Sequence, residues 1–190
     1  SVCSSETAVN IAKLVDGAIA IPHQHGCCEI GDDFDTTKRT LVGFGKNPNV
    51  GAVLVVGLGC EGIQAKDIAD EIKTTGKPVE YIVIQEEGGT AKTVSKGVEI
   101  AGKMAREISK QNKVEFDISE IILGLECGGS DPTSGLASNP SIGVASDMLV
   151  SMGGSSILSE TTEVIGAEHL LYPRFEDENE GKKFLEMVKR

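Results

Sequence analysis

The sequence predicts an α/β fold, with a mostly parallel, Rossmann-like sheet and helices on both of its faces. Short apolar runs alternate along the chain with amphipathic stretches of helical period, which is typical of strand–helix–strand units. Residues 52–56 are continuously apolar, as expected of a strand covered on both faces. Ligands of such sheets bind beyond the carboxyl ends of the strands. We therefore expect an active site in the loops that follow the strands.

The individual elements follow from periodicity and from turn residues. Apolar runs predict strands at residues 18–21, 52–56, 79–85, 118–125 and 155–160. Helical periodicity predicts helices at residues 6–15, 33–44, 63–75, 90–110, 142–151 and 176–190. Gly76 and Pro78 end the third helix, and Gly88-Gly89-Thr90 opens the fourth. We expect one catalytic domain over residues 1–190, as a fragment of a longer chain.

Composition and charge narrow the function classes. A chain with 39% hydrophobic and 25% charged residues is typical of an ordered globular protein. Its 18 basic and 29 acidic residues give a net charge of −11, which argues against partners such as nucleic acid or an anionic membrane. No apolar run approaches the roughly 18 residues of a membrane helix, and no secretion signal is visible, so we expect a cytoplasmic protein. An anionic substrate would need a local positive field from a metal or from buried Arg and Lys.

Five cysteines occur at wide spacing: Cys3, Cys27, Cys28, Cys60 and Cys127. An odd number so spaced does not suggest a disulfide framework, and cysteines in a reducing compartment are more often free, catalytic or metal-bound. Cys27, Cys60 and Cys127 each lie in a polar, glycine-rich loop after a predicted strand. A core cysteine would instead lie within a strand or on an apolar helix face. Cys28 is expected to point away from Cys27 and to pack.

The loop from His23 to Cys27 carries candidate metal ligands. The loop contains His23, His25 and Cys27, and other loops supply Cys60 and Cys127. Imidazole and thiolate are the ligands that zinc and divalent iron prefer. The alternative is a set of satisfied polar residues in a tight turn. The spacing is not the paired C-x-x-C pattern of structural zinc sites, so spacing alone does not identify a metal.

Two further loops could bind an anionic polyol. The turn at Gly89 and Thr90 opens a long helix, whose free N–H groups suit a carboxylate, although a plain helix cap explains the turn equally well. Residues 126–131 end in Ser130 and Asp131, which could hydrogen-bond substrate hydroxyls or could belong to an ordinary capping loop. A lone histidine such as His169 is more often structural than catalytic.

Several motifs occur in one order along residues 1 to 170. They are Ser1-Val2-Cys3-Ser4-Ser5-Glu6-Thr7, Pro22-His23-Gln24-His25-Gly26-Cys27, Asn47-Pro48-Asn49, Gly57-Leu58-Gly59-Cys60-Glu61, residues 85–90, Cys127-Gly128-Gly129-Ser130-Asp131 with Ser134-Gly135, and Glu160 through Gly166-Ala167-Glu168-His169. Together they resemble the altronate and galactarate dehydratase family, which also includes sulfolactate sulfo-lyase. The resemblance covers the central catalytic part of longer proteins, some of which carry a small N-terminal domain or subunit.

The resemblance implies a dehydratase that uses divalent iron or manganese and releases a 2-keto-3-deoxy sugar acid. By motif position it implies metal or active-site roles for His23, Cys27, Cys60 and Cys127, with a weaker match at Cys3. The hypothesis is completed by His25 or His169 as the base or acid, Gly89-Thr90 for the substrate carboxylate, and Arg174 as a further anion partner. His25 and Cys28 stand where the family's loop often has Glu and Gly.

Dehydration requires removal of a weakly acidic proton beside a carboxylate, so the enzyme must stabilise the resulting enediolate. A metal that chelates the carboxylate and the 2-hydroxyl would supply this charge stabilisation. Elimination of sulfite from sulfolactate uses the same proton abstraction. A non-catalytic metal- or ligand-binding module and an inactive fragment are further alternatives. A nucleotide role is disfavoured, since neither G-x-G-x-x-G after the first strand nor G-x-x-x-x-G-K-[ST] is present. The expected partner is a small anionic sugar acid, with a homo-oligomer as an option.

Overall fold

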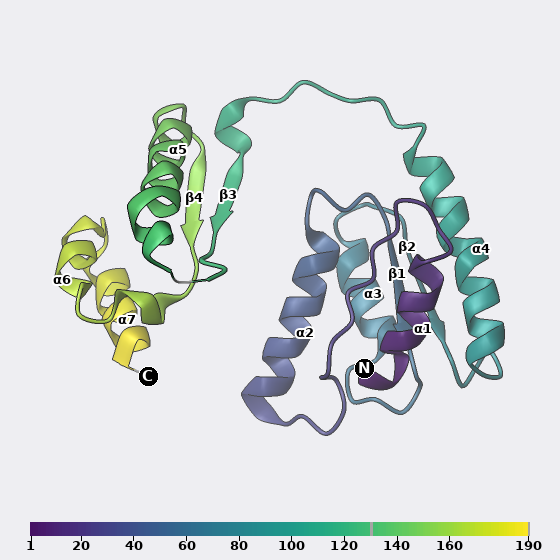
Figure 1. Cartoon of the computed structure of the whole chain (residues 1–190). Coiled ribbons are helices and arrows are strands. Elements are labelled where there is room, and N and C mark those ends of the chain that lie inside the picture. Colours follow the sequence, from purple (N-terminus) through teal and green to yellow (C-terminus); the bar gives the residue numbers. More distant parts are fainter. Residues whose placement is uncertain (130, 190) are drawn as a thin grey trace. The chain divides into compact units, whose positions relative to one another are not determined.

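The computed structural model describes residues 1–129 and 131–189, and the chain divides into two compact units (Figure 1). The first unit is Ser1–Asn112 and the second is Lys113–Arg190. Residues 111–117 form no helix or strand, which accounts for the division. The sequence predicts a single domain over residues 1–190, whereas the packed elements form these two units, and each is described by itself.

The first unit is built around a parallel strand pair. Its elements are α1 (Val2–Ala12), α2 (Gly31–Lys46), β1 (Val53–Gly57), α3 (Ala65–Lys73), β2 (Val79–Val83) and α4 (Thr90–Ile108). The register of the pair runs from Val53 opposite Val79 to Gly57 opposite Val83. Because a parallel pair needs a crossover connection, α3 returns the chain from the end of β1 to the start of β2.

Helices cover the strand pair from two sides (Figure 1). On one side α3 packs against both strands and α2 packs against α3, and on the other α1 packs against α4 and β1. The core lies between α2, α3 and the strands: Val42, Ile63, Ile68, Ala69, Ile72 and Val79. Gly97 brings α4 close to α1, because a Cβ there would collide with the Ile11 side chain.

A buried glutamate stabilises the end of β1. The side chain of Glu61 is only 3% exposed, and its two carboxylate oxygens accept hydrogen bonds of 2.7 Å from the backbone N–H groups of Leu58 and Gly59. Gly59 has φ +127° and lies against the Gln85 side chain, so a larger residue would not fit there. Glu61 therefore fixes the loop in which Cys60 lies.

The second unit contains another parallel strand pair. Its elements are η1 (Ile118–Glu120), β3 (Ile122–Leu125), η2 (Ser134–Ser138), α5 (Asn139–Ser151), β4 (Ser155–Leu158), η3 (Thr161–Val164), α6 (Glu168–Leu171), η4 (Tyr172–Arg174) and α7 (Glu178–Lys189). β3 pairs with β4 from Ile122 opposite Ser155 to Leu125 opposite Leu158. α5 forms the crossover and packs on β4. Both units thus share a strand–helix–strand plan.

The α/β class and the order of most elements are confirmed, but the predicted Rossmann-like sheet is not. In the described residues the four strands form two separate two-stranded sheets, β1 with β2 and β3 with β4. The strand predicted at residues 18–21 is also wrong, because that segment pairs with no other strand and Ile19 is 85% exposed. Apolar character alone indicated a strand there, but a strand needs a hydrogen-bonded neighbour.

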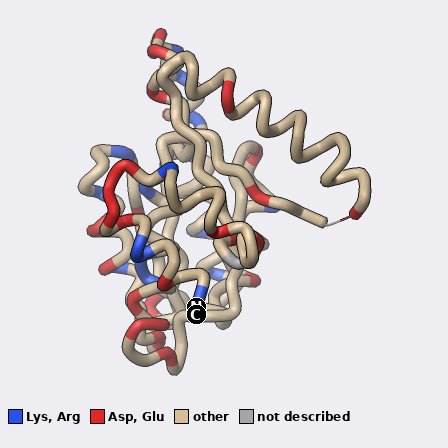
Figure 2. The backbone as a smooth tube through the Cα atoms, turned by 90° about the vertical axis from the view of Figure 1, so that its left-hand side faces the viewer, with Lys and Arg blue, Asp and Glu red and all other residues tan. Residues whose placement is uncertain are grey.

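None of the helices that the structure describes is long and apolar enough to cross a membrane. Figure 2 shows Lys and Arg scattered among acidic and uncharged residues along the described chain.

Truncation of the core should destabilise the protein in proportion to burial. Ile72 is 1% exposed at the centre of the core, so Ile72→Ala should lower the free energy of unfolding by about 2–5 kcal/mol. Ile19→Ala, at a site that is 85% exposed, is the matched control and should change it by less than about 0.5 kcal/mol. Urea denaturation of both variants measures the difference, and equal effects would contradict this description of the core.

Removal of the Glu61 carboxylate should also destabilise the chain. In Glu61→Gln one of the two backbone N–H groups would face the amide –NH₂, so we expect a loss of about 1–3 kcal/mol. Glu80→Gln, at an exposed position of β2, is the control and should leave the denaturation midpoint nearly unchanged. A Glu61→Gln midpoint equal to wild type would show that the carboxylate does not hold the loop.

Candidate functional site

The histidine loop is fixed on the start of α1. The backbone N–H of Val2 donates to the His25 carbonyl at 3.1 Å. Ser5 Oγ donates to the His23 carbonyl at 3.0 Å and accepts from the His23 N–H at 3.3 Å. Gly26, with φ +93°, lies buried against Ser1, and a Cβ there would be 3.2 Å from the Ser1 backbone. These contacts hold the backbone at both histidines.

Glu29 is a site residue that the sequence reasoning missed. Its Oε2 accepts from the Gly26 N–H at 3.0 Å, and its Oε1 accepts from Thr37 Oγ1 at 2.9 Å. Oε1 also lies 3.1 Å from His25 Nδ1. The Glu29 side chain is 14% exposed and that of His25 is 67% exposed, so a largely covered carboxylate holds a histidine that faces solvent. The only sequence signal is a glutamate four residues after a histidine.

The His23 ring has a different environment. Its Nδ1 accepts a hydrogen bond of 3.2 Å from the His25 backbone N–H. Burial, reinforced by nearby positive charge, lowers the pKa of His23 below its usual value and favours the neutral ring. In a neutral ring whose Nδ1 accepts, Nε2 carries the proton. His23 as placed therefore presents a donor at Nε2, and its ring lies 6.5 Å from that of His25 at an interplanar angle of 17°.

Cys27 lies beside Cys28 and within electrostatic reach of Cys3 and Cys60, all in the first unit. Cys27 Sγ and Cys28 Sγ are 3.9 Å apart, and Cys28, which was expected to pack, is exposed with φ +62°. The pKa of the Cys27 thiol is raised, first by its hydrogen bond and charge interaction with Cys28 and also by the nearby Cys3 and Cys60. The structure thus brings Cys27 and Cys60 into one neighbourhood beyond the carboxyl end of β1.

These side chains do not form a metal site as they are placed. Within residues 1–129 and 131–189, no three His, Cys, Asp or Glu side chains converge as ligands of one ion. Among these candidates His23 Nδ1 already accepts the His25 backbone N–H. The thiols and imidazoles have the right chemistry for iron, but their arrangement does not supply three ligands.

The turn before α4 lies at the same sheet edge as Cys60. Gly89 has φ +111° and precedes the first residue of the helix, Thr90, which is exposed. The Gly89 N–H donates to the Ile84 carbonyl at 3.0 Å, so this donor belongs to the turn itself. Gln85 lies against Gly59, which joins the loops after β1 and β2 into one edge. The turn is placed as the sequence predicted, although Gly89 offers no spare N–H.

The remaining predicted residues lie in the second unit. The Cys127 N–H donates to Glu160 Oε2 at 3.0 Å, across the carboxyl ends of β3 and β4. Asp131 Oδ1 accepts from the N–H groups of Thr133 and Ser134 at 2.7 and 3.1 Å, and the Thr133 bonds are the main reason why the pKa of Asp131 is lowered. Asp131 Oδ1 therefore stabilises the turn formed by residues 131–134.

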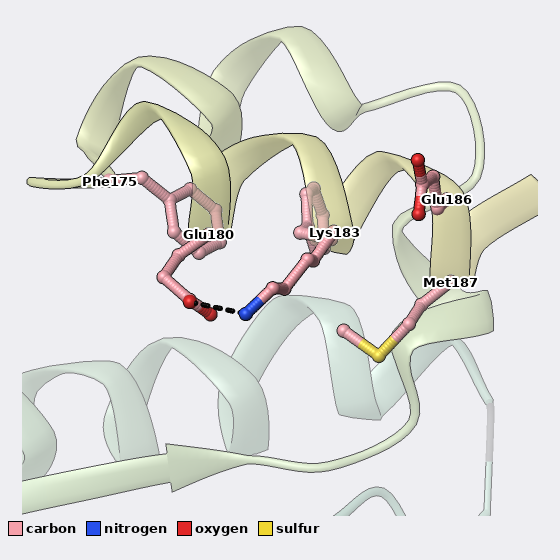
Figure 3. Close-up of a pocket in the computed structure, with 6 residues that line it drawn as sticks. Phe175, Glu180, Lys183, Glu186 and Met187 are labelled. Atoms are coloured by element: carbon pink, nitrogen blue, oxygen red, sulfur yellow. Dashed lines mark hydrogen bonds and ion pairs between the residues drawn. The ribbon is translucent and has the colours of Figure 1, made fainter.

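His169 and Arg174 are exposed on α6 and η4 of the second unit. Ser130 lies outside the described residues. A pocket elsewhere in the unit is lined by Phe175 and residues of α7, with Glu180 and Lys183 paired at 2.7 Å (Figure 3). None of the residues predicted from the sequence lines this pocket. The most developed polar site in the described chain is therefore the histidine and thiol loop of the first unit.

Comparison with known proteins places the two units in one family. Residues 1–109 match the model described as D-galactarate dehydratase/Altronate hydrolase, second domain. Residues 118–190 match D-galactarate/Altronate dehydratase, C-terminal. These ranges coincide closely with the two structural units. No solved structure shows a significant match.

Three similar proteins are named for three different activities. The (2R)-sulfolactate sulfo-lyase subunit beta of Chromohalobacter salexigens is 36% identical over 98% of the chain, which spans 47% of that protein. Altronate dehydratase of Bacillus subtilis is 33% identical over 91%, and galactarate dehydratase (L-threo-forming) of Escherichia coli is 38% identical over 78%. The chain spans 34% and 30% of these two proteins, respectively. The chain belongs to the D-galactarate dehydratase/altronate hydrolase family.

Proposed function

We propose that this chain is the catalytic part of a lyase that removes water from a sugar acid, an altronate-like hexonate or a hexarate, to give a 2-keto-3-deoxy acid. The observation that carries the proposal is the pair of stacked rings, His23 and His25, in the loop that also holds Cys27, which is within electrostatic reach of Cys60 just after β1. This loop lies in the unit that matches the family's second domain. Open parallel sheets bind ligands beyond the carboxyl ends of their strands.

The chemistry of the loop supports dehydration. Elimination of water from a 2,3-dihydroxy acid needs a base for the C2 proton and hydrogen-bond donors for the developing negative charge. His25 is exposed beside a carboxylate and suits the base, and His23 presents a donor at Nε2. The turn at Gly89-Thr90 begins a 19-residue helix, whose N-terminus favours a substrate carboxylate. Roles for His169, Arg174, Ser130 and Asp131 in substrate binding or proton transfer stay predictions from the sequence.

Elimination of sulfite from sulfolactate is the second candidate. Its specific support is the sulfo-lyase subunit, which aligns with 98% of the chain, against 78% for the galactarate dehydratase. Both reactions begin with removal of a proton beside a carboxylate, so the same base would serve either leaving group. Because the chain spans about half or less of these relatives, we propose that further segments or a second subunit complete the enzyme.

A divalent metal, iron(II) or manganese, is a separate proposal on which no step above depends. Its support is donor chemistry, since Cys27 and Cys60 lie close enough to influence each other and thiolates bind ferrous iron well. Cys127 stays a metal ligand predicted from the sequence alone. His23 could join this set only by turning its ring to release Nδ1 from the His25 N–H.

The function is tested by product analysis of the complete protein. Offered D-altronate, D-galactarate and (2R)-sulfolactate, it should release a 2-keto-3-deoxy acid from a sugar acid, and His25→Gln should lower kcat by about 10²–10⁴-fold. Gln24→Ala, an exposed neighbour in the same loop, is the control and should stay near wild type. Sulfite release would favour the second candidate, and absence of any product would leave a binding module.

The metal is tested by elemental analysis of anaerobically purified protein. Wild type should carry near-stoichiometric iron or manganese, and a double Cys27→Ser, Cys60→Ser variant should lose it. Cys28→Ser is the matched control, because its thiol lies beside Cys27 but is not one of the proposed ligands. Full metal retention in the double variant, or metal-free wild type after reconstitution with ferrous iron, would contradict the proposal.

A further inference from the structure

We propose that Glu29 is a positioning residue that fixes the proton of His25 on Nδ1 and so leaves Nε2 as the basic atom, while His23 is held in the opposite tautomer as a donor. The inference deepens the proposed function, on which its catalytic part rests. It assigns unlike roles to two histidines only two residues apart. The contacts that carry it all lie within the first unit.

The Glu29 carboxylate is in direct contact with the His25 ring. Glu29 Oε1 lies 3.1 Å from His25 Nδ1, where an unprotonated nitrogen would set its lone pair against a carboxylate oxygen. Repulsion between these groups disfavours that tautomer, and a proton on Nδ1 turns the same contact into an attraction. The proton of the neutral ring therefore lies on Nδ1, and the lone pair on Nε2.

The Glu29 carboxylate itself has a fixed position. Glu29 is held from the loop by the Gly26 N–H and from α2 by Thr37 Oγ1, so both of its oxygens are engaged. Its side chain is 14% exposed. A carboxylate that is anchored from two sides cannot readily follow a turning imidazole. Glu29 thus sets the orientation of the ring as well as its proton.

The His23 ring carries its proton on the other nitrogen. The His25 backbone N–H donates to His23 Nδ1 at 3.2 Å, so the His23 proton lies on Nε2. His25 therefore has two roles. Its side chain is the base, and its backbone N–H keeps the His23 ring in the tautomer that donates from Nε2. The two rings lie nearly parallel, with centroids 6.5 Å apart, a separation shorter than a six-carbon sugar acid is long.

The proton and electron balance closes within the site. His25 Nε2 takes the C2 proton, and the electron pair of the C2–H bond forms the C2=C3 double bond. The C3–O bond breaks with its pair on oxygen, and the leaving hydroxyl takes the proton from protonated His25 and departs as water. The resulting enol tautomerises to the 2-keto acid. His23 remains neutral throughout and hydrogen-bonds a substrate oxygen as negative charge develops.

The test is the tautomeric state of the two rings in ¹⁵N-histidine-labelled protein. At about pH 8, above the ordinary histidine pKa of about 6.5, long-range ¹H–¹⁵N spectra distinguish the protonated nitrogen of each ring. Wild type should show His25 protonated at Nδ1 and His23 protonated at Nε2. A His25 ring protonated at Nε2 would overturn the proposal whatever substrate the enzyme uses.

Variants separate positioning from folding. In Glu29→Ala we expect His25 to shift toward the Nε2-protonated tautomer, while His23 keeps its own and serves as an internal control for loop structure. Thr37→Val loosens the carboxylate without removing it and should give a smaller shift of the same sign. In the complete enzyme Glu29→Ala should lower kcat by about 10–100-fold with little change in KM. An unchanged His25 tautomer in Glu29→Ala would overturn the proposal.

Discussion

The parallel pairing of β1 with β2 is the constraint on which the first unit depends. It places the carboxyl ends of both strands at one edge, so the loop with Cys60 and the turn before α4 become neighbours. The crossover helix α3 supplies three of the six buried core residues, Ile68, Ala69 and Ile72. The buried Glu61 then fixes the conformation of the Cys60 loop by binding two backbone N–H groups. The loop that follows β1 therefore has a fixed conformation, and this loop carries the Cys60 thiol.

The histidine loop reaches this edge by a different route. It is not an extension of a strand, since residues 18–21 form none, but is tied to the first turn of α1 through Ser5 and Val2. Glu29 adds a link to α2 through Thr37. A loop anchored to two helices can hold polar rings in fixed tautomers while leaving them exposed to a substrate. Such prearranged donors and bases require no reorganisation during the reaction.

Hydrophobic periodicity predicted most elements of the chain, because each helix and strand buries one face or stripe and the pattern records it. The strand predicted at residues 18–21 failed since pairing depends on a neighbour that no local pattern reveals. The division into two small sheets is likewise a property of contacts between distant segments. At the site, residue types pointed to His25 and Cys27. Glu29 escaped notice because its role lies in three contacts of one carboxylate, and the engaged Nδ1 of His23 depends on a backbone bond.

A crystal structure of the complete protein with a bound sugar acid such as D-galactarate is the strongest test of the roles given to the two histidines. We expect the ligand over the loop from His23 to Glu29, with C2 toward His25 Nε2 and a substrate oxygen within about 3 Å of His23 Nε2. A sugar acid bound away from this loop, with neither imidazole in contact with it, would show that these histidines do not carry the reaction. That result would transfer the chemistry to other residues of the protein.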